Sequence, residues 1–128
     1  MLKAATVSVL AIVVGLVAHV AAADQPALEE IGKKQFIRCA SCHSMVDDGQ
    51  DLAGPHLEGI IGRPIAAVEG FAYTEMLQAQ SFVWDEAQLD KWLERPQQMI
   101  PGMCMPFMGL PRAELREALI AYLKNPVP

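Results

Sequence analysis

Apolar residues recur at helical spacing in four segments of the chain, and this pattern predicts four helices. In the first segment, Leu28 and Phe36 fall on one face. In the third, Asp85 and Gln88 have the spacing of a capping box. That helix is expected to end before Pro96, because proline disfavours helical backbone in the residue before it. The predicted helices cover about residues 26–38, 75–80, 85–95 and 111–124.

The segments between these helices are rich in glycine and proline and are predicted to be loops. The longest cover residues 44–70 and 96–110, and no segment alternates strongly enough to predict a strand. Thr74 is the expected N-cap of the short second helix. Loops of this length are uncommon in a small domain. They indicate a chain that wraps around something other than protein.

The N-terminal residues follow the pattern of a secretory signal. A short start with one lysine is followed by an uncharged stretch at residues 4–23, which ends in three alanines. Cleavage is expected after Ala23. The chain then divides into a signal peptide at 1–23 and one domain at 24–128. A retained membrane anchor is the alternative, because the uncharged stretch is long enough to span a bilayer.

Composition limits the chain to one folded domain and narrows its chemistry. The 128 residues are 52% hydrophobic and 20% charged, which excludes a disordered or collagen-like chain. Ten Lys and Arg residues against fifteen Asp and Glu residues give a net charge of −5. Nucleic acid is therefore not an expected partner, since phosphate contacts need clustered basic side chains. Three cysteines are too few for a disulfide framework, so another chemistry must use them.

Residues 39–43 form the sequence C-x-x-C-H, which is typical of covalent haem attachment. Residues three apart share a helix face, so Cys39 and Cys42 can reach one edge of a porphyrin. His43 then lies next to the ring and can coordinate its iron. The alternatives are a redox dithiol and half of a zinc site. A dithiol leaves His43 unexplained, and the sequence has no second such pair to complete a zinc tetrahedron. One haem c is therefore the predicted cofactor.

Six segments of the sequence occur in the order and at the spacing of a known family. They are GKKQFIRCASCH at 32–43, GPHLEGIIGR at 54–63, GFAYTEML at 70–77, FVWDEAQLDKWLERP at 82–96, IPGMCMPFMGL at 100–110 and LIAYLK at 119–124. They resemble the class I cytochromes c, in particular mitochondrial cytochrome c and bacterial cytochrome c2. The resemblance implies the all-α cytochrome c fold, with about four helices and long loops around one covalently attached haem. Gly32 is expected to permit a close crossing of the first and last helices.

The resemblance also implies the second axial ligand of the iron. Met105 follows a Pro-Gly pair and corresponds to the family's ligating methionine, on the haem face opposite His43. Met103 is the main competitor, and Cys104 is a third candidate. A thioether is soft and neutral, so it favours Fe(II) and raises the reduction potential. Two filled axial positions leave no open site for oxygen or peroxide.

Four further residues correspond to family positions that hold the haem. Pro55 is implied to accept a hydrogen bond from the free N–H of His43, which fixes the ring's tautomer. Arg63, Tyr73 and Trp84 are implied to donate to a haem propionate, since a buried anion needs such partners. The alternatives are an ordinary surface charge for Arg63 and core packing for the two aromatic residues.

The sequence departs from the family at several positions near the haem. Met103 stands where a threonine is usual, and Trp92 where a tyrosine is frequent. Cys104 replaces a common lysine, and its thiol is either a site for disulfide-linked dimers or a partly buried, inert group. Gln97 and Gln98 occupy a rim that is rich in lysine in mitochondrial carriers. We therefore expect a largely apolar docking surface with weak electrostatic steering.

The expected function is one-electron transfer in the bacterial periplasm, between respiratory or photosynthetic complexes. The expected donor is a membrane cytochrome complex, and the expected acceptor is an oxidase, a reductase or another redox protein. No catalytic residue and no small-molecule substrate are expected, and membrane contact is expected only if the signal is retained. The alternatives are a haem c subunit of a larger oxidoreductase and a ligand-binding or peroxidatic haem protein.

Overall fold

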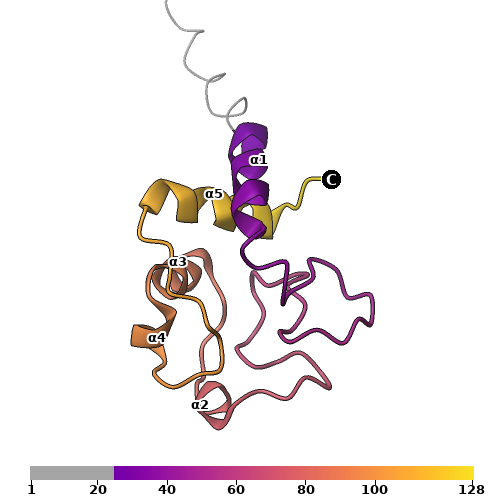
Figure 1. Cartoon of the computed structure of the whole chain (residues 1–128), viewed down its shortest axis with the longest axis vertical. Helices are drawn as coiled ribbons and strands as arrows, with labels where there is room; N and C mark the ends of the chain where they lie inside the picture. Colours follow the sequence, from indigo (N-terminus) through magenta and orange to yellow (C-terminus); the bar gives the residue numbers. More distant parts are fainter. Residues whose placement is uncertain (1–24) are drawn as a thin grey trace, which may run out of the picture.

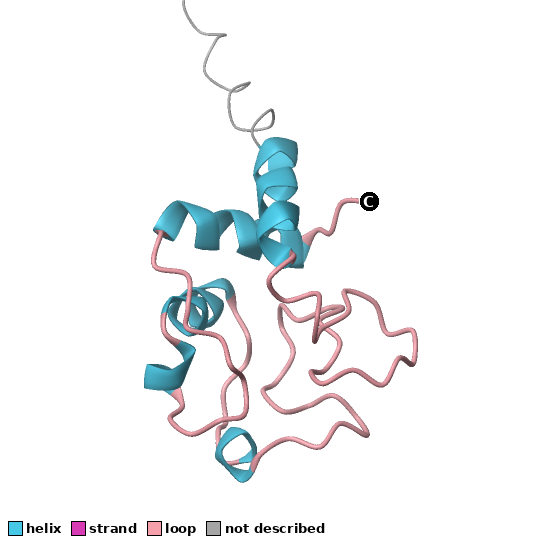
Figure 2. Cartoon of the chain, viewed as in Figure 1, coloured by secondary structure: helices cyan, strands magenta, loops and turns pink. Residues whose placement is uncertain are grey.

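The computed structural model describes residues 25–128, which form five helices joined by long loops (Figure 1). The helices are α1 (Gln25–Phe36), α2 (Glu75–Gln78), α3 (Glu86–Glu94), α4 (Pro96–Met99) and α5 (Ala113–Lys124). Within this part of the chain there is no strand, and one isolated bridge joins Pro64 to Val83 (Figure 2). The predicted all-α class is confirmed.

The helix α4 was not expected from the sequence, which predicted a loop from residue 96. Pro96 does end the preceding helix, since α3 stops at Glu94, but it also begins α4. Its fixed φ suits the first turn of a helix, where the missing N–H would have had no partner. Arg95 makes the corner between the two helices, with φ −152° and ψ 73°.

The helices α1 and α5 cross at the top of the molecule in Figure 1 and make the most extensive helix contact. Gly32 lies at the crossing. A Cβ atom at this position would lie 2.0 Å from the carbonyl oxygen of Ala118 and 2.7 Å from Cβ of Tyr122. Glycine is therefore required here, which confirms the expected close crossing. The ring of Phe36 packs beside Tyr122, with centroids 5.5 Å apart.

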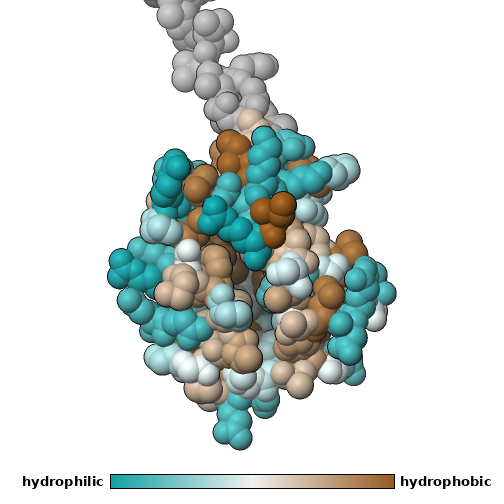
Figure 3. Space-filling model, viewed as in Figure 1, coloured by the Kyte–Doolittle hydropathy of each residue, from teal (hydrophilic) through white to brown (hydrophobic). Residues whose placement is uncertain are grey.

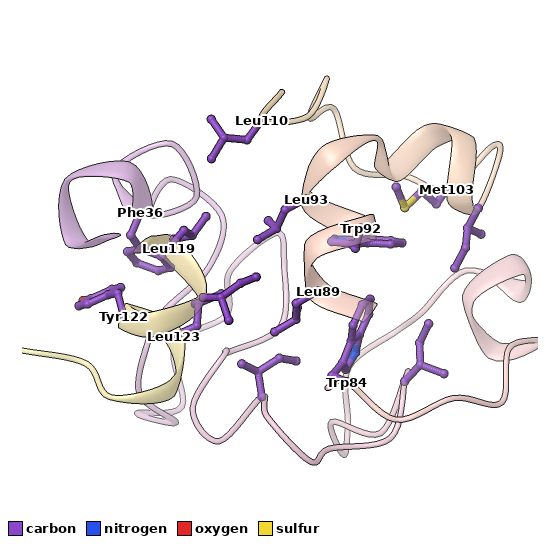
Figure 4. Close-up of a cluster of buried hydrophobic side chains, with 14 residues drawn as sticks. Phe36, Trp84, Leu89, Trp92, Leu93, Met103, Leu110, Leu119, Tyr122 and Leu123 are labelled. Carbon is purple, nitrogen blue, oxygen red and sulfur yellow. The ribbon is translucent and has the colours of Figure 1, made fainter. Parts of the chain in front are cut away.

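The buried side chains gather in two groups that meet in one core (Figure 4). One group lies between α1 and α5, and the other lies around α3. Trp84 and Trp92 pack edge to face in the second group, with ring centroids 5.2 Å apart. Burial of each large apolar side chain contributes about 1.5–3 kcal/mol. The labelled members are Phe36, Leu119, Tyr122 and Leu123 in the first group, and Trp84, Leu89, Trp92, Leu93, Met103 and Leu110 in the second.

Below the crossing, the chain separates into two parts that face each other. In Figure 1, the loops after α1 lie on one side, and α3, α4 and the loop that follows α4 lie on the other. The space-filling view is hollowed between these two parts (Figure 3). None of the helices in residues 25–128 is long and apolar enough to cross a membrane. The expected signal peptide at 1–23 lies outside the described residues.

Candidate functional site

The C-x-x-C-H motif forms a tight coil directly after α1. The amide of Cys39 donates to the carbonyl of Phe36 at 2.8 Å, and the amides of Cys42 and His43 both donate to the carbonyl of Cys39 at 2.9 Å. This coil places all three motif side chains in half-buried positions below the α1–α5 crossing. The arrangement follows from local hydrogen bonds, because each of them spans three or four residues.

The imidazole of His43 is held by the loop that follows the motif. Its Nδ1 lies 2.7 Å from the carbonyl oxygen of Pro55. A carbonyl accepts only, so Nδ1 carries the proton and Nε2 keeps its lone pair. Burial lowers the pKa of His43, which favours the neutral ring, and the hydrogen bond that the ring donates to the carbonyl of Pro55 opposes this shift more weakly. The ring is therefore in the form that binds a metal through Nε2.

Gly54 lets the loop approach the ring of His43, a contact that the sequence alone did not reveal. A Cβ atom at residue 54 would lie 2.4 Å from Cε1 of His43, well inside van der Waals contact. Two backbone bonds hold the loop there. The amide of Gly54 donates to the carbonyl of Cys42 at 2.8 Å, and the amide of Leu57 donates to the carbonyl of Ser44 at 2.7 Å.

The two motif cysteines differ from a reactive dithiol. Both are free in the structure. Burial raises the pKa of the Cys39 thiol, and the nearby Arg38 opposes this more weakly. The attacking thiol of a redox dithiol has a lowered pKa instead, because the thiolate is the nucleophile. The surroundings of Cys39 therefore do not favour the dithiol alternative.

Two backbone bonds bring Arg63 and Trp84 together from distant parts of the sequence. The amide of Trp84 donates to the carbonyl of Arg63 at 2.9 Å, and the amide of Gly62 donates to the carbonyl of Trp84 at 2.8 Å. The guanidinium of Arg63 is half-buried and donates to the carbonyl of His56 at 2.8 Å. Burial lowers its pKa, while the nearby Tyr73 opposes the shift. Arg63 therefore differs from an ordinary surface charge.

Trp84 and Tyr73 occupy different environments. Trp84 is buried and packs against Phe82 and Trp92, so it is part of the core. Its indole N–H makes no hydrogen bond among the residues that the structure describes. The hydroxyl of Tyr73 accepts a hydrogen bond from the amide of Val68 at 3.3 Å, and burial raises its pKa. Both aromatic residues therefore pack against protein and keep an O–H or N–H for a further partner.

Thr74 was expected to cap α2, but its hydroxyl does not. The residue is at the N-cap position, yet its side chain makes no capping hydrogen bond. Its Oγ1 is buried and has no partner within residues 25–128. A buried hydroxyl without a hydrogen bond is costly, so its position indicates a polar group that these residues do not supply. In the sequence, the only sign that Thr74 belongs to the site is its position next to Tyr73.

The three candidates for the sixth ligand have different surroundings. Met103 is 5% exposed and belongs to the core, where Figure 4 shows it on the α4 side of Trp92. Cys104 is exposed, so the partly buried alternative for this thiol is wrong. Met105 is half-buried and packs against the edge of the core.

These features fit a covalently attached haem. Two free cysteines lie on one coil, the imidazole of His43 has Nε2 available to a metal, and the buried hydroxyl of Thr74 has no partner within residues 25–128. The hollow in Figure 3 lies between the two loop-bearing parts of the molecule. The chemistry of the donor set therefore agrees with the cofactor that the C-x-x-C-H motif predicts.

Comparison with known proteins also indicates a protein that carries haem c. The cytochrome c family profile matches residues 29–126. The chain is 43% identical to cytochrome c of Gibberella zeae over 88 residues, which are 69% of this chain and 83% of that protein. It is 36% identical to cytochrome c2 of Rhodoblastus acidophilus over 96 residues (75% and 90%) and 38% identical to cytochrome c-550 of Ancylobacter novellus over 97 residues (73% and 91%).

The matched region includes the two cysteines and the histidine of the motif, together with every residue expected to hold the haem. Haem c, attached through cysteines and carrying iron, is the cofactor of this family, and its members are electron carriers. The chain belongs to the cytochrome c family, which confirms the expected family, fold class and cofactor.

Proposed function

We propose that this protein is a periplasmic one-electron carrier whose haem iron is ligated by His43 and Met105. The bound haem c supplies a one-electron Fe(III)/Fe(II) couple. The observation that carries the proposal is the 2.7 Å contact between Nδ1 of His43 and the carbonyl of Pro55. It leaves Nε2 for the iron and fixes the orientation of the ring before the metal binds. Cys39 and Cys42 form the thioether links.

Met105 is supported as the sixth ligand by the surroundings of its competitors. Met103 is packed into the core, so its sulfur would have to leave apolar neighbours to reach the iron. Cys104 is exposed and would need to lose its proton to ligate as a thiolate. Met105 is only partly buried at the edge of the core, and as a neutral thioether it has no proton to lose. A neutral thioether stabilises Fe(II), which suits a carrier of moderately high potential.

Arg63, Tyr73 and Trp84 are proposed to hold a haem propionate, and we add Thr74 to this set. A propionate that is tucked inside the protein is a buried anion, which requires hydrogen bonds and a positive charge. Arg63 supplies the charge from a half-buried position. The unpaired Oγ1 of Thr74 supplies a donor that the protein leaves unused.

The proposed cellular role follows from the signal pattern and the small size of the domain. Cleavage after Ala23 would release residues 24–128 into the periplasm. There the protein would accept electrons from a membrane cytochrome complex and pass them to an oxidase, a reductase or another redox protein. The intact mass of the mature protein tests this: residues 24–128 plus one haem support it, and retention of residues 1–23 contradicts it.

The variant Met105→Ala tests the ligand assignment, with the exposed Met108→Ala as its control. We expect Met105→Ala to abolish the weak red absorption band that reports methionine–iron bonding in the ferric protein. It should also lower the midpoint potential and allow the ferrous protein to bind carbon monoxide, since the sixth position is then open. Met108→Ala should behave as the wild type. An unchanged spectrum in Met105→Ala would contradict the assignment.

A further inference from the structure

The loop between α4 and α5, residues 100–112 and here called the methionine loop, is bridged near its middle by the side chain of Gln97. Its Nε2 lies 2.8 Å from the carbonyl oxygen of Met105 and 3.4 Å from that of Met103. A primary amide carries two N–H donors, so one side chain serves both carbonyls, which flank Cys104. Among the residues described, no other side chain donates to a carbonyl of residues 101–109.

Gln97 extends from a well-anchored position. It lies in the first turn of α4, directly after Pro96, which is one of the two largest fully buried residues. The carbonyls of Arg95 and Pro96 accept from the amides of Gln98 and Ile100, each at 3.0 Å. The side-chain amide of Gln97 therefore extends from a helical turn that the buried Pro96 and backbone hydrogen bonds hold in place.

The far end of the same loop is held by other means. The amide of Leu110 donates to the carbonyl of Leu93 at 2.7 Å, and Arg116 donates to the carbonyl of Leu110 at 3.0 Å. At Gly109, a Cβ atom would lie 2.0 Å from the carbonyl of Glu94, so the backbone there lies against α3. These contacts stop short of Met105, whose carbonyl accepts locally from the amide of Phe107 at 2.8 Å, so the bond from Gln97 ties the ligand's own peptide to α4.

We propose that Gln97 is a positioning residue that keeps Met105 on the haem iron. The inference rests on the proposed function, namely ligation by Met105. Loss of the side-chain amide leaves the carbonyl of Met103 without this donor and leaves the carbonyl of Met105 with the local bond from the amide of Phe107 at 2.8 Å. The loop then opens more often, and an external ligand reaches the iron more quickly.

The test compares Gln97→Ala and Gln97→Glu with Gln98→Ala in the haem-loaded protein. Gln97→Glu keeps the length of the side chain but removes the N–H donors. Gln98 is the exposed neighbour on the same short helix and makes no side-chain hydrogen bond within the described residues. We measure how fast added imidazole displaces the methionine, from loss of the red ferric band. Both Gln97 variants should exchange about fivefold faster, the factor expected for one lost neutral hydrogen bond, and Gln98→Ala should match the wild type.

Two further measurements make the outcomes decisive. Chemical denaturation should give all three variants the same midpoint, because the proposed effect is local to the loop. A midpoint that falls in step with the faster exchange would indicate general loosening and overturn the inference. Equal exchange rates in the Gln97 and Gln98 variants would also overturn the inference. If Met105→Ala then still lost the red band, the assignment of Met105 as ligand would stand. Retention of the band in Met105→Ala would overturn both.

Discussion

At the scale of single residues, the site depends on small groups that allow a close approach. The ring of His43 rests against a glycine, and its Nδ1 is met by a carbonyl rather than by a side chain. A backbone acceptor cannot change its protonation state, so it holds one tautomer of the ring over a wide pH range. The buried hydroxyl of Thr74 is the opposite case, since it has no hydrogen-bond partner in the described residues, and we propose it as a donor to the haem propionate.

The variant Gly54→Ala tests the close approach to His43. The added methyl group would lie 2.4 Å from Cε1 of the ring, so either the loop or the imidazole must move. We expect a lower yield of haem-loaded protein and a loss of about 1–3 kcal/mol in the free energy of unfolding, the usual cost of overpacking. The neighbouring Ala53 is exposed, and Ala53→Ser should leave both quantities unchanged. Equal yield and stability in the two variants would contradict the tight contact.

At the scale of helices, α3 and α5 are joined by one arginine near the methionine loop. Arg116 is 7% exposed, and its Nε donates to Oδ1 of Asp90 at 2.7 Å. The same guanidinium donates to the carbonyls of Leu110 and Pro111 at 3.0 and 2.9 Å. Arg116 therefore ties both helices to the end of the methionine loop, and its planar group with five donors suits this role.

The variant Arg116→Met keeps the apolar stem but removes all of these hydrogen bonds. We expect a loss of about 1–3 kcal/mol in the free energy of unfolding, because the carbonyls of Leu110 and Pro111 lose their partner. The exposed Arg112, whose ion pair within residues 25–128 is with the exposed Glu114, provides the control. Arg112→Met should not change the stability measurably, since surface ion pairs contribute little. Similar denaturation curves for the two variants would refute the assigned role of Arg116.

At the scale of the whole molecule, the segment that carries Met105 has no charge, although Arg95 lines a pocket together with its Gln97, Gln98 and Met108. Residues 96–111 contain no charged side chain, although the chain has 25 in all (10 basic and 15 acidic). Met108 in this segment is 91% exposed and Cys104 is also exposed. A surface of this kind associates through apolar contact rather than through long-range attraction.

The rate of electron transfer to a redox partner should therefore depend only mildly on ionic strength. Electrostatic steering raises association rates by about 10–1000-fold, and salt removes that gain. We expect the second-order rate constant of this protein to fall by clearly less than about 10-fold between low and physiological salt. Stopped-flow mixing with a partner complex over a salt series measures it. A steep decline would show that charged groups elsewhere on the surface guide docking.

The sequence and the structure agree most closely where the signal is local. The capping box at Asp85 is present, since its side chain accepts from the amide of Gln88 at 2.7 Å. The prediction failed at Pro96, where one residue both ends α3 and begins α4. Thr74 is at the predicted N-cap position, but its hydroxyl makes no capping bond and is buried without a partner in the described residues. At Pro96 the reason is local, since its fixed φ suits a first helical turn, whereas the burial of the Thr74 hydroxyl comes from packing.

The helical class, the haem motif and the family can all be read from the sequence, because the first two depend on the spacing of nearby residues and the family on the order and spacing of six segments along the chain. The tertiary structure alone decided which carbonyl orients His43, which glycine lies against the ring, which methionine is packed into the core and which glutamine bridges the ligand's loop. Each of these contacts joins segments that loops of variable path bring together, and their geometry exists only once the chain has packed.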